Sequence, residues 1–136
     1  WVHNPDYREG KTTSVKAGVG ELLKSDQTKS LQGVLALNVD QPRTATTFKR
    51  ILEEHHQYTP LITIPTYRGK SGHPAILSST LLDELMGISE QNLGLKEVVH
   101  RHCKETHFVE MDNDEVLLDL NSQKDYWQAV EKFGSG

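Results

Sequence analysis

The segment from Gly33 to Pro42 constrains the fold more than any other part of the chain. It reads GVLALNVDQP, an almost continuous apolar run that ends in the carboxylate of Asp40 and in a proline. Half-exposed antiparallel strands alternate apolar and polar residues, and this run barely alternates, so it predicts a parallel strand covered on both faces. Proline cannot continue a central strand. Because open parallel sheets bind ligands beyond the carboxyl ends of their strands, Asp40 is expected to face a cleft.

The composition limits the classes of function. A length of 136 residues is enough for one domain. The chain has 15 Lys and Arg residues against 19 Asp and Glu residues, a net charge of -4, and no basic cluster, so nucleic acid is not an expected partner. No apolar run approaches the ~20 residues that cross a bilayer. The single cysteine, Cys103, cannot form an internal disulfide, and we expect a cytoplasmic protein with no membrane partner.

Short apolar runs alternate along the chain with segments of helical periodicity. Thr44 is a plausible cap of the second helix, and Ser122 with Asp125 resembles a capping box for the last one. The last helix is expected to pack four apolar side chains, Tyr126, Trp127, Val130 and Phe133. Helices are expected at about 13–24, 48–55, 81–86, 95–102 and 122–133, and strands at about 33–40, 60–67, 108–111 and 116–120. This order predicts a three-layer α/β/α domain over residues 1–133 with a mainly parallel sheet, followed by a tail at 134–136.

Two carboxylates at expected strand ends could carry chemistry. Asp40 ends one apolar run, and Asp119 lies in a later one, just before the capped helix. Acids from two strand ends can converge on one hard cation such as Mg²⁺, which prefers oxygen ligands and serves phosphoryl and nucleotidyl transfer. From the spacing alone, either aspartate could instead cap a turn or a helix.

Two other motifs do not carry a function. The run from Gly10 to Thr13 looks like the end of a phosphate-binding Walker A loop, but Pro5 stands where that pattern needs its first glycine. His100 and His102 are two residues apart on an expected helix and point in different directions, so a zinc site that combines them is not expected.

Four further motifs follow one another along nearly the whole chain. The first comprises Asn4, Pro5, Gly10, Ser14 and Gly18, the second Asp40 and Pro42, the third Pro65, Tyr67, Gly69, Gly72, His73 and Pro74, and the fourth Asp119, Leu120, Asn121, Ser122, Asp125 and Tyr126. In this order they resemble the MobA-like nucleotidyltransferases, the family of the molybdenum-cofactor cytidylyltransferases and guanylyltransferases. The resemblance implies a Rossmann-like fold of the nucleotide-diphospho-sugar transferase type.

The resemblance also implies a reaction and a site. The family binds an NTP, here CTP or GTP, with Mg²⁺, and couples the nucleotide to a phosphorylated acceptor such as molybdopterin, releasing pyrophosphate. Asp40 and Asp119 match the catalytic, metal-binding acids, with Asn121 as a further metal ligand. The matching substrate positions are Gly10 and Ser14 on the nucleotide side, and Gly72, His73 and Pro74 on the acceptor side. For His73, a purely conformational role is equally open.

The chain departs from the family pattern in several places, which include Lys16, where arginine is common, and Gln91 with Asn92, where the family tends to have an acidic residue. The family begins with a glycine-rich segment, L-A-A-G-x-S-x-R-M-G-x-x-K, that grips the triphosphate, whereas this sequence starts at Trp1 without it. Arg43 stands where an apolar residue usually follows the D-x-P motif. We therefore expect an N-terminally truncated domain and, by itself, a poor enzyme, since losing one preorganised donor can cost about 10²–10³ in rate.

Two functions stay open from the sequence. One is a nucleotidyltransferase whose first segment lies outside this chain, and the other is a non-catalytic derivative that serves as a ligand-binding or assembly module. A sheet that starts in its middle also has an unpaired edge, so a homo-oligomer through that edge is expected.

Overall fold

A computed structural model describes residues 1–134, apart from the side chain of Gln27. Its strands are β1 (Gly33–Ala36), β2 (Ile62–Tyr67), β3 (Lys70–Ser71), β4 (Ala75–Ser78) and β5 (Thr106–Glu110). Its α-helices are α1 (Lys11–Lys24), α2 (Ala45–Tyr58), α3 (Leu82–Leu85), α4 (Leu95–Arg101) and α5 (Gln123–Phe133). Short 3-10 helices are η1 (Tyr7–Glu9), η2 (Asp26–Ser30), η3 (Ser79–Leu81), η4 (Cys103–Glu105) and η5 (Asp114–Leu117). None of the described helices is long and apolar enough to cross a membrane.

Capping decides where two of the longer helices begin. The Thr44 hydroxyl accepts a hydrogen bond from the Thr47 amide and starts α2, as the sequence predicted. Ser122 and Asp125 form the full reciprocal capping box that starts α5, which confirms that prediction too. Helix α2 ends at Thr59, which adopts the left-handed conformation with φ of 45°.

The sheet is mixed. Its order is β1-β4-β2-β3, and β5 pairs with the other side of β2. Only the β2–β5 pair is parallel among the described strands, and β1–β4, β4–β2 and β2–β3 are antiparallel. The α/β class is therefore confirmed, but the expectation of a mainly parallel sheet is wrong, because β4 inserts between β1 and β2 in the opposite direction.

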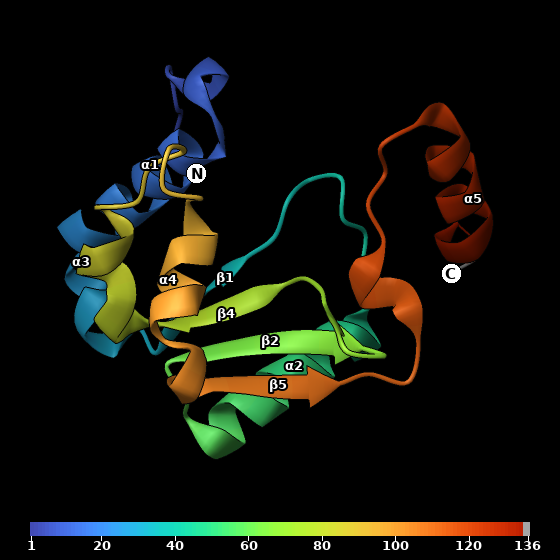
Figure 1. Ribbon diagram of the computed structural model, residues 1–136. Coiled ribbons are helices and arrows are strands. Elements are labelled where there is room, and N and C mark those ends of the chain that lie inside the picture. Colours follow the sequence, from blue (N-terminus) through green and yellow to red (C-terminus); the bar gives the residue numbers. More distant parts are fainter. Residues whose placement is uncertain (135–136) are drawn as a thin grey trace.

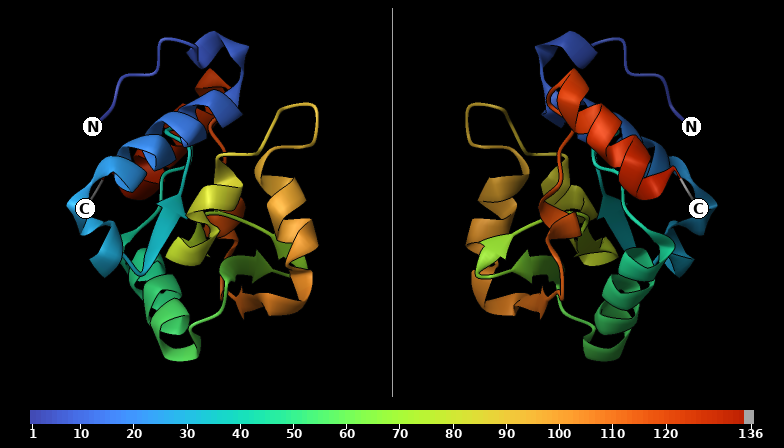
Figure 2. Two further views of the ribbon diagram at one scale, coloured as in Figure 1. Left: turned by 90° about the vertical axis from the view of Figure 1, so that its left-hand side faces the viewer. Right: turned by 90° about the vertical axis from the view of Figure 1, so that its right-hand side faces the viewer.

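Helices cover the two faces of the sheet (Figure 1). Figure 2 shows α2 and α4 on opposite sides of the strands. The larger buried cluster joins the sheet to α1, α3 and α4 through residues such as Ile64, Leu82 and Val98. The smaller cluster contains Ile51 of α2 and Val116 of η5, both fully buried. These two apolar layers fix β2 in the middle of the molecule.

Three further expectations are corrected. Strand β1 is short and lies at the sheet's edge, so Leu35 is 41% exposed and Val39 fully exposed, not covered on both faces. The run at 116–120 is not a strand, since η5 occupies its start and Leu118 to Leu120 are irregular. Helix α5 leaves three of the four expected apolar side chains exposed, namely Tyr126, Trp127 and Val130, while Phe133 is partly buried. The proposed tail begins at Gly134, the cap of α5, and residues 135–136 lie outside the described part.

Candidate functional site

The two acids singled out in the sequence belong to segments that meet at one place. The Leu120 amide donates to the Asp40 carbonyl at 2.8 Å, so the backbone of one segment holds the other. Strand β1 ends at Ala36, and Asp40 therefore lies in a turn beyond the strand. Asp119 follows η5, also outside any strand. Figure 1 shows the link from β1 to α2 crossing to the η5 segment.

Gln41 positions the second acid. Its side chain is buried, at 4% exposure, and its amide nitrogen donates to Oδ1 of Asp119 at 2.8 Å. Its amide oxygen accepts from the Asn38 amide at 3.0 Å, which fixes which end of the side chain faces the carboxylate. A buried side chain with both ends bonded has little freedom to turn away. The Asp40 turn and the Asp119 segment are thus joined twice, by the side chain of Gln41 and by the backbone hydrogen bond from Leu120 to Asp40.

Arg43 gathers three segments of backbone around the site. Its guanidinium donates to the carbonyls of His73, Leu118 and Val116, each at 2.9 Å, and to that of Pro42 at 2.7 Å. The planar guanidinium has several donors in a fixed arrangement and is suited to hold several acceptors at once. The residue that departs from the family pattern is therefore the structural centre of this region.

Burial and the neighbouring acids have opposite effects on the pKa of Arg43. Desolvation lowers the pKa of Arg43, and Asp119, Glu115 and Asp40 raise it again by their negative charge. Since the usual pKa of arginine lies far above neutrality, the group stays cationic. Glu115 is 4% exposed and accepts hydrogen bonds from the Thr44 amide and hydroxyl, which satisfies this buried carboxylate at the start of α2. One cation and three carboxylates leave the region net negative.

The loop from Gly72 to Pro74 lies against the same segment. The His73 amide donates to the Val116 carbonyl at 2.9 Å, and the Gly72 amide donates to the Pro65 carbonyl at 2.8 Å. A Cβ atom at Gly72 would lie 2.3 Å from the Val116 oxygen, so this close approach requires glycine. Packing therefore explains Gly72 of the third motif, and the loop brings His73 within electrostatic range of Asp119.

The surroundings of His73 favour its neutral form. Desolvation lowers its pKa most, and Asp119 opposes this by raising it. His73 is exposed to solvent, and water screens these electrostatic effects on its pKa. The positive charges of Lys11 and Arg43 also lower the pKa of His73. The first turn of α1, which contains Lys11, therefore lies within electrostatic range of the loop.

Gly10 and Ser14 lie at the start of α1. The Thr12 amide donates to Glu90 at 2.7 Å, and Ser14 accepts from the Asn4 side chain at 2.9 Å. Gly10 is the N-cap and has a φ of 124°, a conformation that favours glycine. In residues 1–134 no hydrogen bond joins Gly10 or Ser14 to the Asp40 turn, and only the charge of Lys11 connects this helix end with His73.

The donor set at Asp40 suits a hard cation. Its Oδ1 atom is buried and has no hydrogen-bond partner among the described residues, which is unusual for a carboxylate oxygen in a folded protein. Asp119 keeps Oδ2 free of any recorded hydrogen bond, and Asn121 is exposed two residues further on. Carboxylate and amide oxygens are what Mg²⁺ prefers, and it commonly takes only one or two protein carboxylates. Within the described range no group of three or more His, Cys, Asp or Glu side chains could hold a metal.

The sequence predicts Asp40 and Asp119 as site residues and does not predict the residues that contact them, Gln41, Arg43 and Glu115. Gln41 stands at the variable position of the D-x-P motif and carries no signal of its own. The signal for Arg43 in the sequence is its departure from the apolar residue that usually follows the D-x-P motif. Glu115 belongs to a polar stretch, and nothing local in the sequence says that it is buried.

The chain is similar to several known proteins in sequence and in fold. The chain is 28% identical over 133 residues to the molybdenum cofactor cytidylyltransferase of Escherichia coli (strain K12), covering 97% of the chain and 62% of that protein. The crystal structure of Rv0371c from Mycobacterium tuberculosis H37Rv matches with a TM-score of 0.69 at 24% identity, over 89% of this chain and 60% of that one. A manganese complex of Rv0371c matches with a TM-score of 0.64 at 23% identity, over 85% and 59%.

The matched relatives are longer than this chain, which spans about three fifths of their length. The likeness to the two crystal structures supports the α/β fold. The family model for the MobA-like NTP transferase domain matches residues 1–106, a range that includes Asp40 and His73 and ends before Asp119. Because the match covers most of the sequence, the chain belongs to the MobA-like NTP transferase family.

Proposed function

We propose that this chain forms the metal- and acceptor-binding part of a cytoplasmic nucleotidyltransferase. The substrates are an NTP, either CTP or GTP, and a phosphorylated small molecule of the molybdopterin type. The observation that carries the proposal is the junction of the Asp40 turn with the Asp119 segment, where a buried carboxylate oxygen lacks a partner. The family membership and the cytidylyltransferase named among the relatives support the reaction class.

Each residue of the proposed site has its own role. Asp40 and Asp119, with Asn121 beside them, would hold one divalent ion, Mg²⁺ or Mn²⁺. When bound, this ion neutralises negative charge on the phosphate oxygens. Gln41 holds Asp119 in place, and Arg43 holds the surrounding backbone while its own donors are already engaged. Arg43 is therefore a positioning residue.

The loop at Gly72, His73 and Pro74 would face the acceptor. In the reaction, an oxygen of the acceptor phosphate attacks the α-phosphorus of the nucleotide. A new P–O bond forms, the bond to the bridging oxygen breaks, and pyrophosphate leaves with the electron pair. A neutral His73 can donate a hydrogen bond to the incoming phosphate from one ring nitrogen. Gly10 and Ser14 would lie on the nucleotide side, near the first turn of α1.

Titration calorimetry tests the proposal with CTP, GTP and ATP, each with and without Mg²⁺. We expect binding of one nucleotide that requires the metal, and its loss in Asp40→Asn and in Asp119→Asn. The matched control is Asp83→Asn, which removes one charge from an exposed helical position away from the site. Metal-dependent binding that survives in both site variants would contradict the proposal.

A measurement of pyrophosphate release distinguishes nucleotidyl transfer from nucleotide binding alone. A phosphate-coupled assay with nucleotide and molybdopterin should give turnover if the chain is catalytic in the form tested. Metal-dependent binding without turnover would favour the ligand-binding module that the sequence also allowed. A single-turnover assay is the suitable format, because it also detects slow transfer.

A further inference from the structure

Helix α1 is capped by a residue from a distant loop. Its N-cap position is Gly10, which has no side chain to accept a hydrogen bond from the first amides of the helix. The Thr12 amide instead donates to Oε1 of Glu90 at 2.7 Å, across 78 positions of sequence. A carboxylate also interacts favourably with the positive end of the helix dipole. The loop between α3 and α4, which contains Glu90, therefore supplies the cap that Gly10 lacks.

Two glycines allow this loop to lie directly on the first turn of α1. A Cβ atom at Gly10 would lie 2.4 Å from Oε1 of Glu90, in the space that the carboxylate occupies. A Cβ atom at Gly94, at the other end of the loop, would lie 2.9 Å from the side chain of Thr12. Thr12 is buried, at 7% exposure. The close fit between the loop and the helix start thus requires a residue without a side chain on each side.

The loop that carries Glu90 has a defined shape. Ile88 anchors its first part in the larger buried cluster, at 2% exposure. The amides of Asn92 and Gly94 both donate to the Ser89 carbonyl, at 3.2 and 2.8 Å. Figure 1 shows the loop beside the start of α1. A loop that is anchored and closed by its own hydrogen bonds can hold Glu90 in one place.

The capped turn is also connected with the candidate site. Lys11 belongs to this turn, and its positive charge acts on His73 in the loop at Gly72 to Pro74. Gly10 is the N-cap of α1 and Ser14 lies in its first turns, and both are expected on the nucleotide side. The orientation of the first turn therefore decides where these two residues stand relative to the acids.

We propose that Glu90 is a positioning residue of the nucleotide side of the site. Its carboxylate holds the first turn of α1 in the helical form, and this keeps Gly10 and Ser14 in place for the nucleotide. The inference rests on the proposed function, since it needs the nucleotide to bind beside this turn. Without the cap, the first amides of α1 lose a fixed partner and the turn frays, so a smaller fraction of molecules is ready to bind.

Two substitutions of Glu90 test the role of the hydrogen bond. Glu90→Ala removes the acceptor, whereas Glu90→Gln keeps a side-chain oxygen that can accept from the Thr12 amide. Titration calorimetry of the full chain with CTP and with GTP, each with Mg²⁺, measures the affinity. We expect the affinity for the nucleotide that binds to fall roughly 3- to 30-fold in Glu90→Ala, the range that loss of a helix cap gives, and to recover in Glu90→Gln. Gln91→Ala is the matched control, because Gln91 is exposed in the same loop.

Hydrogen exchange followed by nuclear magnetic resonance tests the cap without any nucleotide. The Thr12 amide should exchange faster in Glu90→Ala than in the parent chain and in Glu90→Gln. Amides near Val19, which is buried in the middle of α1, should keep their protection and show that the chain is folded. Equal protection of the Thr12 amide in Glu90→Ala and in the parent chain would overturn the assignment of Glu90 as the cap.

The outcomes of the calorimetry separate this inference from the proposed function. If the parent chain binds a nucleotide and Glu90→Ala binds it equally well, the positioning role of Glu90 is wrong and the proposed function stands. Tighter binding in Glu90→Ala would also overturn the positioning role, because the carboxylate would then compete with the nucleotide for the start of α1. If the parent chain binds neither nucleotide, the proposed function fails, and the role of Glu90 on the nucleotide side fails with it.

Discussion

At the scale of single residues, the site is held by contacts that cross long stretches of sequence. Gln41 reaches Asp119 across 78 positions, and Arg43 reaches Val116 and Leu118 across more than 70. The two acids themselves could be predicted, because each belongs to a motif that resembles the family. Their supporting residues could not, since no local pattern reveals a hydrogen bond to a distant segment.

Gln41 should control the affinity for a divalent metal. Replacement by methionine keeps the length and volume of the side chain and removes the donor to Asp119, so that this carboxylate is no longer held in one orientation. Residues that support a metal ligand typically contribute 10–100-fold to affinity, and we expect a loss of about that size. Mn²⁺ titration followed by electron paramagnetic resonance measures it.

Gln57→Met is the matched control, because Gln57 is exposed on α2. The urea midpoint of Gln41→Met distinguishes positioning from general unfolding, since a folded variant with weak Mn²⁺ binding supports the assignment. Equal Mn²⁺ affinity in Gln41→Met and the parent chain would remove Gln41 from the metal site.

At the scale of elements, the sequence predicts those helices and strands whose position depends on nearby residues. The capped helices and β2 appear where sequence periodicity and cap residues placed them. Strand β4 was missed and β1 was expected to be buried, because the position of a strand within a sheet depends on distant partners. The apolar run after Glu115 begins in the 3-10 helix η5 and does not form a strand. The buried carboxylate of Glu115 in η5 accepts a hydrogen bond from Thr44 at the start of α2.

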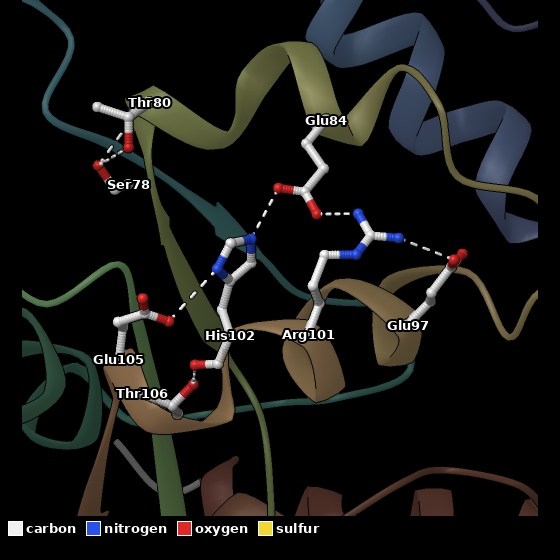
Figure 3. Close-up of polar contacts among 8 residues, drawn as sticks. All are labelled: Ser78, Thr80, Glu84, Glu97, Arg101, His102, Glu105 and Thr106. Carbon is white, nitrogen blue, oxygen red and sulfur yellow. Dashed lines mark hydrogen bonds and ion pairs between the residues drawn. The ribbon is translucent and has the colours of Figure 1, made fainter.

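Helices α3 and α4 are joined by a network of charged side chains (Figure 3). His102 Nε2 lies 2.8 Å from Glu84, and Arg101 pairs with Glu84 and, at 2.9 Å, with Glu97. The hydrogen bond with Glu84 is the main cause that raises the pKa of His102, and the same bond lowers the pKa of Glu84. The pair is therefore charged over a wider pH range in the folded chain than in the unfolded one.

Stability should depend on pH through His102 in a defined direction. A raised pKa means that the folded state holds the proton more tightly, so this stabilisation is complete below the ordinary histidine pKa of about 6.5. It is lost as the pH rises through the raised value. The free energy of unfolding of the parent chain minus that of His102→Gln should therefore fall as the pH rises above the ordinary histidine pKa of about 6.5.

Urea unfolding at a series of pH values gives this difference. Taking the difference between the two chains cancels His55 and His73, whose lowered pKa values act in the opposite direction and make the fold less stable as the pH falls. His100→Gln is the matched control, because His100 is exposed on α4, two residues before His102. A difference that stays constant with pH would show that the His102–Glu84 pair does not titrate as described.

At the scale of the whole molecule, the layers around β2 are well packed and α5 stands apart from them (Figure 1). The recorded ion pair between α5 and the preceding segment joins Lys132 to Asp114 at 3.7 Å, and both side chains are at least half exposed. Such surface pairs contribute little to stability. Ala129 is the buried residue of α5, while Trp127 is 58% exposed. Helix α5 is thus held mainly by its capping box and by the chain that leads into it.

This arrangement predicts that α5 opens without unfolding the rest. An isolated helix of 11 residues is marginal in water, so α5 amides should exchange hydrogen through local opening at a small free energy. Helix α2 is the internal comparison, because it carries a cap of similar quality and buries Ile51 completely. Amides of α2 near Ile51 and of β2 should exchange only with global unfolding. Hydrogen exchange followed by mass spectrometry measures both helices in one sample, and equal protection of α5 and α2 would show that the exposed face of α5 is covered in solution.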